Sequence, residues 1–234
     1  MEKRKQIYEG KAKKVYETDD PDLFIQEFKD DATAFDAKKR GTIQQKGVVN
    51  NKISNILFNM LESKGIKTHF VKQLDERNML IKKVEIVPLE VTIRNIVAGG
   101  MAKLLALEEG ITLGEPVFEY HYKKDSLHDP LINDYHARAL KLANQEELEF
   151  IEKTSFIIND LLKSFFDKKG LILVDFKLEF GRYKGKILLA DEISPDTCRL
   201  WDKETRKKLD KDRFRRDLGG IEDAYQEVLR RVTG

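Results

Sequence analysis

Apolar and polar residues alternate along several segments of the first hundred residues, a pattern typical of strands that bury one face. The clearest case is residues 84–97, where a period of two divides the side chains into two sets. These sets are Leu89, Val91 and Ile93 on one face, and Glu90, Thr92 and Arg94 on the other. Shorter strands are predicted at residues 5–17 (as two pieces), 23–28, 68–74 and 78–83.

Apolar residues at helical spacing predict four helices, at residues 45–64, 101–109, 145–169 and 211–231. Two of them are followed by Gly65 and Gly170, at the position where glycine often ends a helix. The last helix is expected to bury Phe214, Leu218, Ile221, Tyr225, Val228 and Leu229. Residues 115–137 are rich in His, Asp, Asn and Tyr, so we expect an irregular, mobile active-site loop there. Strands in runs and helices in separate blocks predict an α+β fold with mostly antiparallel sheets.

Two strands are predicted at residues 171–180 and 186–193, joined by a turn at 181–185. Along the first strand, period two assigns Val174, Phe176, Leu178 and Phe180 to the core, and Asp175, Lys177 and Glu179 to the other face. If the turn pivots near Gly185, Glu179 lies opposite Asp191. Two such carboxylates repel unless a cation bridges them, and oxygen ligands without nearby His or Cys suit Mg²⁺ that also binds substrate phosphates. A charged strand face neutralised by its own lysine is the alternative interpretation.

Two basic segments could bind phosphate groups. Gly10 and the lysines Lys11 and Lys13 form a predicted turn between strands, where backbone N–H groups and ammonium charges can meet an anion. Arg94 comes shortly before Gly99 and the start of a predicted helix, which is also a favourable place for a phosphate. A solvated basic turn and a surface ion pair between Arg94 and its strand neighbour Glu90 remain open as alternatives.

Composition narrows the functional classes. The chain has 234 residues, of which 41% are hydrophobic and 36% charged, and its net charge is only +2. A balance of 43 basic and 41 acidic residues argues against a protein that coats nucleic acid. The single cysteine, Cys198, excludes an internal disulfide and fits a reducing compartment. With no secretory signal and no apolar run of membrane-spanning length, we expect a cytoplasmic protein without a membrane or nucleic-acid partner.

Several motifs, in this order along the chain, closely resemble the SAICAR synthetase family of purine biosynthesis. They lie at residues 8–13, 87–94, 173–181, 191–196, 199–202 and 210–215, so the resemblance covers essentially the whole chain. It implies an ATP-dependent ligase that joins L-aspartate to carboxyaminoimidazole ribonucleotide (CAIR) through an acyl phosphate, giving SAICAR, ADP and phosphate. The implied architecture has two lobes with an ATP cleft between them, similar to protein kinases and ATP-grasp enzymes. We place the N-terminal lobe at residues 1–83 and the C-terminal lobe at 84–234, and we expect a homodimer.

The resemblance also implies roles for individual residues. Those assigned to the nucleotide are Lys11, Ala12, Lys13 and Val15 above it, Lys82, Val84 and Ile86 at the adenine hinge, and Lys123, Glu179 and Asp191 near the phosphates. Glu179 and Asp191 would also hold Mg²⁺. Those assigned to the ribonucleotide are Asp36, Arg94, Gly100, Asp175, Lys177, Arg199, Lys211 and Arg215. The catalytic set is Lys177, Asp175, Arg94 and, from the expected mobile loop, Asp129.

One position departs from the family pattern, because Gly100 stands where the family usually has a serine. A hydroxyl to the substrate phosphate is therefore absent, although the backbone N–H could still donate. The sequence leaves two other functions open. One is a small-molecule kinase that uses the same ATP site, and the other is a non-enzymatic nucleotide or nucleic-acid binder. A site rich in lysines, arginines and carboxylates, with no activated serine or cysteine, suits phosphoryl transfer by positioning and charge neutralisation.

Overall fold

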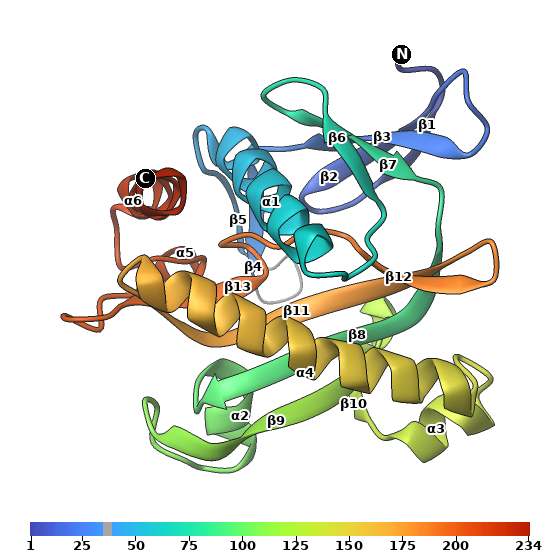
Figure 1. The fold of residues 1–234 in the computed structure, drawn as a ribbon. Coiled ribbons are helices and arrows are strands. Elements are labelled where there is room, and N and C mark those ends of the chain that lie inside the picture. Colours follow the sequence, from blue (N-terminus) through green and yellow to red (C-terminus); the bar gives the residue numbers. More distant parts are fainter. Residues whose placement is uncertain (35–38) are drawn as a thin grey trace.

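The computed structural model describes residues 1–34 and 39–234, and its strands form two main antiparallel sheets and a small one (Figure 1). The first sheet has the order β1-β2-β3-β7-β6. Its strands are β1 (Gln6–Glu9), β2 (Lys13–Glu17), β3 (Leu23–Phe28), β6 (Phe70–Gln73) and β7 (Asn78–Lys82). The small sheet pairs β4 (Asp31–Ala34) with β5 (Lys39–Thr42). Asp36, which the resemblance assigns to the ribonucleotide, lies outside the described residues.

The second sheet has the order β10-β9-β8-β11-β12, and β13 also pairs with β11. Its strands are β8 (Glu85–Ile96), β9 (Thr112–Tyr122), β10 (Leu131–Ile132), β11 (Leu171–Tyr183), β12 (Lys186–Ala190) and β13 (Cys198–Asp202). On β8, Leu89, Val91 and Ile93 are buried. The α+β fold with antiparallel sheets is thus confirmed.

Two long helices cover the sheets (Figure 1). Helix α1 (Lys46–Ser63) packs on the first sheet and against α6 (Ile221–Thr233), while α4 (Gln145–Lys168) lies along β11 and β8. The start of α4 is encoded locally, because Asn144 and Glu147 form a capping box, each side chain accepting the other's backbone N–H. The remaining helices are short: α2 (Gly99–Leu104), the 3-10 turn η1 (Asp125–Leu127), α3 (Asp134–Ala139) and α5 (Asp212–Arg215).

One hydrophobic core joins the two halves of the chain. The same cluster contains Phe28 and Met79 of the first sheet, Phe58 of α1, and Phe176 and Leu189 of the second sheet. Backbone pairing also connects them, since the His69 N–H donates to the Leu189 carbonyl at 2.8 Å. The strands of the first sheet end at Lys82 and those of the second begin at Glu85, but the division into two domains at residue 83 stays a prediction.

A buried polar cluster ties the C-terminal helix to the rest of the fold. Asp196, which follows β12, accepts a hydrogen bond from the fully buried Lys46 of α1 at 2.8 Å. Its other carboxylate oxygen accepts from the hydroxyl of Tyr225 on α6 at 2.5 Å. Lys211 adds a longer contact to Asp196 at 3.4 Å. Burial leaves no water to replace these partners, so the cluster holds three distant segments in one place.

Two of the predicted elements are wrong. Residues 115–137 are not mainly an irregular loop, because residues 112–122 form the long strand β9, followed by η1, β10 and α3. The predicted helix at 211–231 is broken into α5 and α6, and the break contains Gly219 and Gly220, which both have positive φ. Leu218, expected in the core, is therefore 46% exposed, whereas Tyr225 and Val228 are buried.

The hairpin also differs from the prediction in register. Its turn consists of Lys184 and Gly185, both with positive φ, as a tight two-residue hairpin turn requires. Glu179 therefore pairs with Ala190, and the expected pairing of Glu179 with Asp191 is wrong by one residue. Val174 also departs from the prediction, which assigned it to the core face of the strand. A register shift between Leu173 and Asp175 interrupts the alternation, and Val174 packs with Ile96, Ala98 and Trp201 rather than with the main core.

Within the described parts of the chain, no helix combines the length and the apolar character that crossing a membrane requires.

Candidate active site

The polar face of the second sheet meets the β1–β2 turn of the first sheet. Lys11 in this turn donates to Asp125 of η1 at 3.0 Å, and Lys13 forms ion pairs with Asp191 and Glu192 just after β12. Ala12 accepts the Lys29 N–H through its carbonyl, and Val15 pairs with Gln26 in the ladder to β3. The basic turn that the sequence predicts therefore lies against the carboxylate hairpin rather than in open solvent.

Glu179 and Asp191 lie close enough to influence each other's charge. Asp191 is the first residue beyond β12 and has a φ of 63°, in the left-handed region. Burial and the charge of Asp191 raise the pKa of Glu179 to about 7. Burial opposes ionisation of Asp191 as well, but the ammonium group of Lys13 outweighs it and lowers the pKa of that carboxyl.

Each of these two carboxylates is paired with the side chain of a lysine. Lys13 bonds to Asp191, and Lys123, just after β9, bonds to Glu179. Burial alone would lower the pKa of Lys13, yet the carboxylates of Asp191 and Glu192 raise it above its usual range. Two carboxyl groups and two ammonium groups are therefore paired within one patch, a suitable surface for phosphate groups accompanied by a divalent cation.

The donor set fits a metal–nucleotide complex better than a free ion. Among residues 1–34 and 39–234, no cluster of three or more His, Cys, Asp or Glu side chains could hold a metal ion. The two oxygen donors present, Glu179 and Asp191, have side chains that are 15% and 24% exposed. Mg²⁺ typically uses one or two protein carboxylates and takes its other ligands from phosphates and water. The residues therefore fit Mg²⁺ that arrives with ATP.

The backbone of Asp191 is held by the first sheet. His69, next to β6, lies with its Nε2 3.1 Å from the Asp191 carbonyl, and Gln26 of β3 donates to the same oxygen at 3.4 Å. Burial lowers the pKa of His69 to about 4, so the ring is neutral at neutral pH and its Nε2–H is the donor. These contacts stabilise a backbone conformation that is uncommon for a residue other than glycine.

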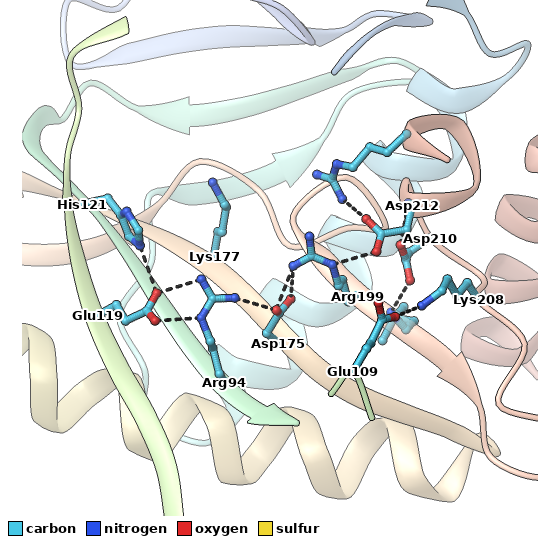
Figure 2. Close-up of polar contacts among 12 residues, drawn as sticks. Arg94, Glu109, Glu119, His121, Asp175, Lys177, Arg199, Lys208, Asp210 and Asp212 are labelled. Atoms are coloured by element: carbon cyan, nitrogen blue, oxygen red, sulfur yellow. Dashed lines mark hydrogen bonds and ion pairs between the residues drawn. The ribbon is translucent and has the colours of Figure 1, made fainter. Parts of the chain in front are cut away.

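Five side chains of alternating charge form a chain of ion pairs across β9, β8, β11, β13 and α5 (Figure 2). Their order is Glu119, Arg94, Asp175, Arg199 and Asp212. Arg94 makes a bidentate contact with Glu119, at 2.9 and 2.8 Å, and donates from Nη1 to Asp175 at 2.9 Å. The Nη1 of Arg199 donates to both oxygens of Asp175, at 3.0 and 2.8 Å.

The end carboxylates of this chain stay ionised. Burial alone would raise the pKa of Glu119, but hydrogen bonds from His121 and Arg94 lower it to about 2. Burial opposes ionisation of Asp212 too, and the charges of Arg199 and Arg215 lower its pKa to about 2. The described residues contain no ion pair between Arg94 and Glu90, which was the alternative that the sequence left open. Glu90 instead pairs with Lys177.

Gly99 and Gly100 lie beside the two guanidinium groups. A Cβ on Gly99 would collide with the guanidinium of Arg199, and its φ of 53° independently favours glycine. Gly100 has no such restriction. A Cβ there would lie 3.9 Å from Nη2 of Arg94, an ordinary van der Waals distance. The position where the family usually has serine therefore has room for one.

Most of the predicted site residues fall into two neighbouring groups. Lys13, Lys123, Glu179 and Asp191 form a lysine–carboxylate group, while Arg94, Asp175, Arg199 and Arg215 belong to the chain of ion pairs or contact it. Lys177 stands between them, since it follows Asp175 and precedes Glu179 on the outward face of β11. Its side chain is 46% exposed.

Other predicted residues lie at the edges of this face. Lys82 donates to the Thr68 carbonyl at 2.8 Å, Val84 packs against Gly181, and Ile86 is 38% exposed. Asp129 has a φ of 47° and accepts the Lys124 N–H at 2.7 Å. Lys211 points to the Asp196 cluster and not to the chain of ion pairs, and its pKa is lowered by burial.

Sequence reasoning missed four side chains that the structure places at the site: His69, Glu119, His121 and Asp212. For Glu119 and His121 a signal was present, because residues 117–122 alternate apolar and polar like a strand. His69 carries no local signal, since its partner Asp191 is far away in sequence. Asp212 lies only three residues before its partner Arg215, but its bond to Arg199 depends on how β13 and α5 are arranged.

Comparison with known proteins gives consistent results. A sequence profile described as SAICAR synthetase matches residues 6–232. A phosphoribosylaminoimidazole-succinocarboxamide synthase from Clostridium botulinum is 60% identical over 233 residues, covering the full length of both chains. The crystal structure of the synthase of the same name from Ehrlichia chaffeensis superposes with a TM-score of 0.97 at 45% identity, covering 98% of each chain.

A solved structure described as SAICAR synthetase (Type-2) in complex with ADP has a TM-score of 0.94 at 52% identity, covering 97% of each chain. Profile, sequence and structure agree over nearly the whole chain. This chain therefore belongs to the SAICAR synthetase family and is an ATP-dependent ligase of purine biosynthesis.

Proposed function

We propose that this chain joins L-aspartate to CAIR at the polar face of the second sheet, with ATP bound under the β1–β2 turn. The observation that carries this assignment is the order of charges on β11. Asp175 belongs to the chain of ion pairs, Glu179 belongs to the lysine–carboxylate group, and Lys177 stands between them. Two anionic substrates bound to the two groups would meet at Lys177.

ATP would bind to the lysine–carboxylate group. Lys11, Ala12 and Lys13 of the β1–β2 turn would cover the phosphates together with Lys123, and Val15 would contact the nucleotide from the same sheet. The segment containing Lys82, Val84 and Ile86 would contact the base. In support, a relative with 52% identity is described in complex with ADP.

Glu179 and Asp191 would hold Mg²⁺ together with the nucleotide phosphates. The ion would supply positive charge that neutralises the phosphate oxygens during transfer. Lys13 and Lys123 already neutralise the same carboxylates, so they can move their charge to the phosphates once a cation replaces them. This exchange would preserve the charge balance of a largely buried site.

The ribonucleotide would bind to the chain of ion pairs. Its phosphate dianion would accept hydrogen bonds from Arg94 and Arg199 and from the N–H of Gly100, with Arg215 nearby. Lys211, which the resemblance also assigns to the substrate, is paired with Asp196. Asp175, held between two guanidinium groups, is an acceptor suited to ribose hydroxyls. Asp36 completes the family set but lies outside the described residues.

The chemistry would proceed in two steps. A carboxylate oxygen of CAIR attacks the γ-phosphorus of ATP, ADP leaves, and an acyl phosphate forms. The amine of L-aspartate then attacks the acyl carbon, phosphate leaves, and the amine loses a proton as the amide forms. Lys177 would neutralise the reacting carboxylate, with Arg94 and Asp175 orienting the ring and Asp129 near the nucleotide side.

Three further features belong to this proposal, and the first of them, the division into two lobes, rests on the family resemblance. The chain would have an N-terminal lobe at residues 1–83 and a C-terminal lobe at 84–234. It would act as a homodimer, and it would reside in the cytoplasm.

A coupled assay of ADP release tests the reaction. Sustained ADP release should require the ribonucleotide, L-aspartate and Mg²⁺ together, and SAICAR should form in equal amount. A small-molecule kinase would release ADP without L-aspartate and would form a phosphorylated product instead. Sustained ADP release without L-aspartate would therefore contradict the ligase proposal.

A further inference from the structure

We propose that Asp212 is a positioning residue for the ribonucleotide, because its two carboxylate oxygens fix the guanidinium groups of Arg199 and Arg215. The inference rests on the proposed function, in which these two arginines bind the substrate. Asp212 was not among the predicted site residues.

The geometry assigns one oxygen of Asp212 to each of these two arginines, and Arg216 adds a longer contact to Oδ2 at 3.7 Å. Oδ2 accepts from Nε of Arg199 on β13 at 2.9 Å, and Oδ1 accepts from Nη1 of Arg215 on α5 at 2.6 Å. Figure 2 shows Asp212 at the end of the chain of ion pairs, beyond Arg199. One carboxylate therefore sets the distance between two cations that come from different elements.

The carboxylate of Asp212 is itself fixed before substrate binds. Its side chain is 1% exposed, and its backbone N–H donates to Asp210 Oδ1 at 2.7 Å. The charges of Arg199 and Arg215 hold its pKa at about 2, so it is ionised at neutral pH. Because Asp212 is buried and both its oxygens are occupied, it acts through the arginines and does not touch the substrate.

The hydrogen bonds of Arg199 to Asp212 and Asp175 leave one edge of its guanidinium group without a partner in the described part of the chain. Nε is held by Asp212 and Nη1 by Asp175, whereas Nη2 has no hydrogen-bond partner within residues 1–34 and 39–234. Nη2 lies against Gly99, where any Cβ would collide with it. Asp212 and Asp175 thus fix the guanidinium of Arg199 against Gly99, the residue before Gly100, whose N–H is proposed to meet the substrate phosphate.

The competing explanation is that Asp212 only anchors α5 to the sheet. An anchor alone would lower stability and affect all substrates to a similar degree. A positioning residue for Arg199 and Arg215 would act selectively on the ribonucleotide. The ratio of the effects on the individual KM values therefore separates the two explanations.

The test compares Asp212→Asn with Glu109→Gln, which also replaces a carboxylate by an amide. Glu109 pairs with Lys208 (Figure 2) and with Arg216, and none of its ion pairs involves Arg199 or Arg215. Because Arg216 also lies 3.7 Å from Asp212, the control tests as well whether that longer contact matters. We expect Asp212→Asn to raise the KM for the ribonucleotide about ten- to a hundredfold, the usual effect of losing a charge-assisted hydrogen bond. The KM values for ATP and L-aspartate should stay within about twofold, and Glu109→Gln should match the wild type.

Asp212→Glu tests whether a carboxylate at this position restores substrate binding. It keeps the charge but displaces the carboxylate by one methylene. Its KM for the ribonucleotide should lie between those of the wild type and Asp212→Asn. If Asp212→Asn does not fold at the assay temperature, Asp212→Glu alone decides. An unchanged KM for the ribonucleotide in that variant, or an equal rise for all three substrates, would overturn the proposal.

Arg199→Ala separates this inference from the proposed function. If Arg199→Ala leaves the KM for the ribonucleotide unchanged, the proposed substrate role of Arg199 fails. If Arg199→Ala raises that KM but Asp212→Asn does not, only the positioning role fails. In the double variant the two effects should be much less than additive in free energy, because Asp212 acts partly through Arg199. Full additivity would contradict that coupling.

Discussion

Lys13 of the first sheet and Asp191, the residue that follows β12 of the second sheet, form an ion pair at the active site. The pair is largely buried, with side chains that are 13% and 24% exposed. Lys13 also bonds to Glu192 at 2.9 Å, so a single ammonium group neutralises two consecutive carboxylates. In the absence of nucleotide, this lysine balances the negative charge that Asp191 would otherwise present to Mg²⁺ and phosphate.

Replacing that lysine tests its role in nucleotide binding. Lys13→Met keeps most of the side-chain volume but removes the charge that would move to the ATP phosphates. We expect the KM for ATP to rise about tenfold or more, with the KM for the ribonucleotide within about twofold. Lys14→Met, on the next position of β2, is the matched control and should leave both values unchanged. If Lys13→Met raised the KM for ATP and the KM for the ribonucleotide equally, the variant would have a general loss of structure instead of a specific loss of nucleotide binding.

Glu179→Gln tests the proposed metal ligand. Because burial and Asp191 raise the pKa of Glu179 to about 7, this carboxyl group is only partly ionised at neutral pH. The amide keeps the shape of the side chain and removes only part of a full charge, so we expect a small change in melting temperature. The Mg²⁺ concentration for half-maximal turnover should rise about tenfold or more, since an amide is a weaker ligand than a carboxylate. Turnover that stays at the wild-type level under limiting Mg²⁺ would remove Glu179 from the metal site.

His69 predicts a specific dependence of stability on pH. Burial lowers its pKa from 6.5 to about 4, so below pH 6.5 the unfolded chain binds a proton that the folded protein excludes. The contribution of His69 to the free energy of unfolding is complete above pH 6.5 and is lost as the pH falls toward 4. The slope approaches 1.4 kcal/mol per pH unit, or about 2 kcal/mol between pH 6.5 and 5.

His69→Gln removes the titration while retaining an N–H donor that can reach the Asp191 carbonyl. Urea unfolding at pH 7 and pH 5 should show that the wild type loses about 2 kcal/mol more than the variant. His136→Gln is the control for the loss of a histidine. It replaces an exposed ring that accepts the Asn133 N–H at 3.3 Å in the capping box of α3, a position where glutamine can also accept, and it should follow the wild type. Equal losses in the wild type and His69→Gln would show that His69 titrates normally in the folded protein.

Gly100→Ser and Gly99→Ser form a matched pair beside the two arginines. At Gly100 a Cβ meets only ordinary contacts, so the serine hydroxyl can donate to the substrate phosphate. We expect the KM for the ribonucleotide to fall about two- to tenfold, the usual effect of one added hydrogen bond. At Gly99 the new Cβ collides with Arg199 and φ is 53°, so that variant should raise the same KM and lower the melting temperature. Steady-state kinetics and thermal unfolding measure both, and an unchanged KM for Gly100→Ser would mean that its hydroxyl does not reach the phosphate.

Period-two alternation predicted much of the site from the sequence. On β8 and β11 it placed Arg94, Asp175, Lys177 and Glu179 on the face opposite the core, because side-chain direction within one strand depends only on local backbone geometry. The α+β class followed from the grouping of strands and helices. Period two could not reveal the register shift that moves Val174 out of the main core, since a bulge depends on the neighbouring strand.

Relations between distant segments were harder to predict. The two-residue turn at Lys184 and Gly185 shifts the hairpin register by one residue, and the left-handed backbone of Asp191 then determines where its carboxylate lies. Sequence alone gives neither the turn type nor this backbone angle. Asp212 was assigned to a long helix and Glu119 to a loop, so neither was considered as a partner for an arginine. Their roles depend on a sheet that brings residues 94, 119 and 199 together.

The Asp196 cluster has a consequence for the order in which the fold can be completed. Lys46 and Tyr225 lie 150 and 29 positions away from Asp196 along the sequence. Contacts across such separations form after local ones, because closing a longer loop costs more conformational entropy. Local hairpins such as β11–β12 can therefore form early, whereas the docking of α6 against α1 is a late step of folding.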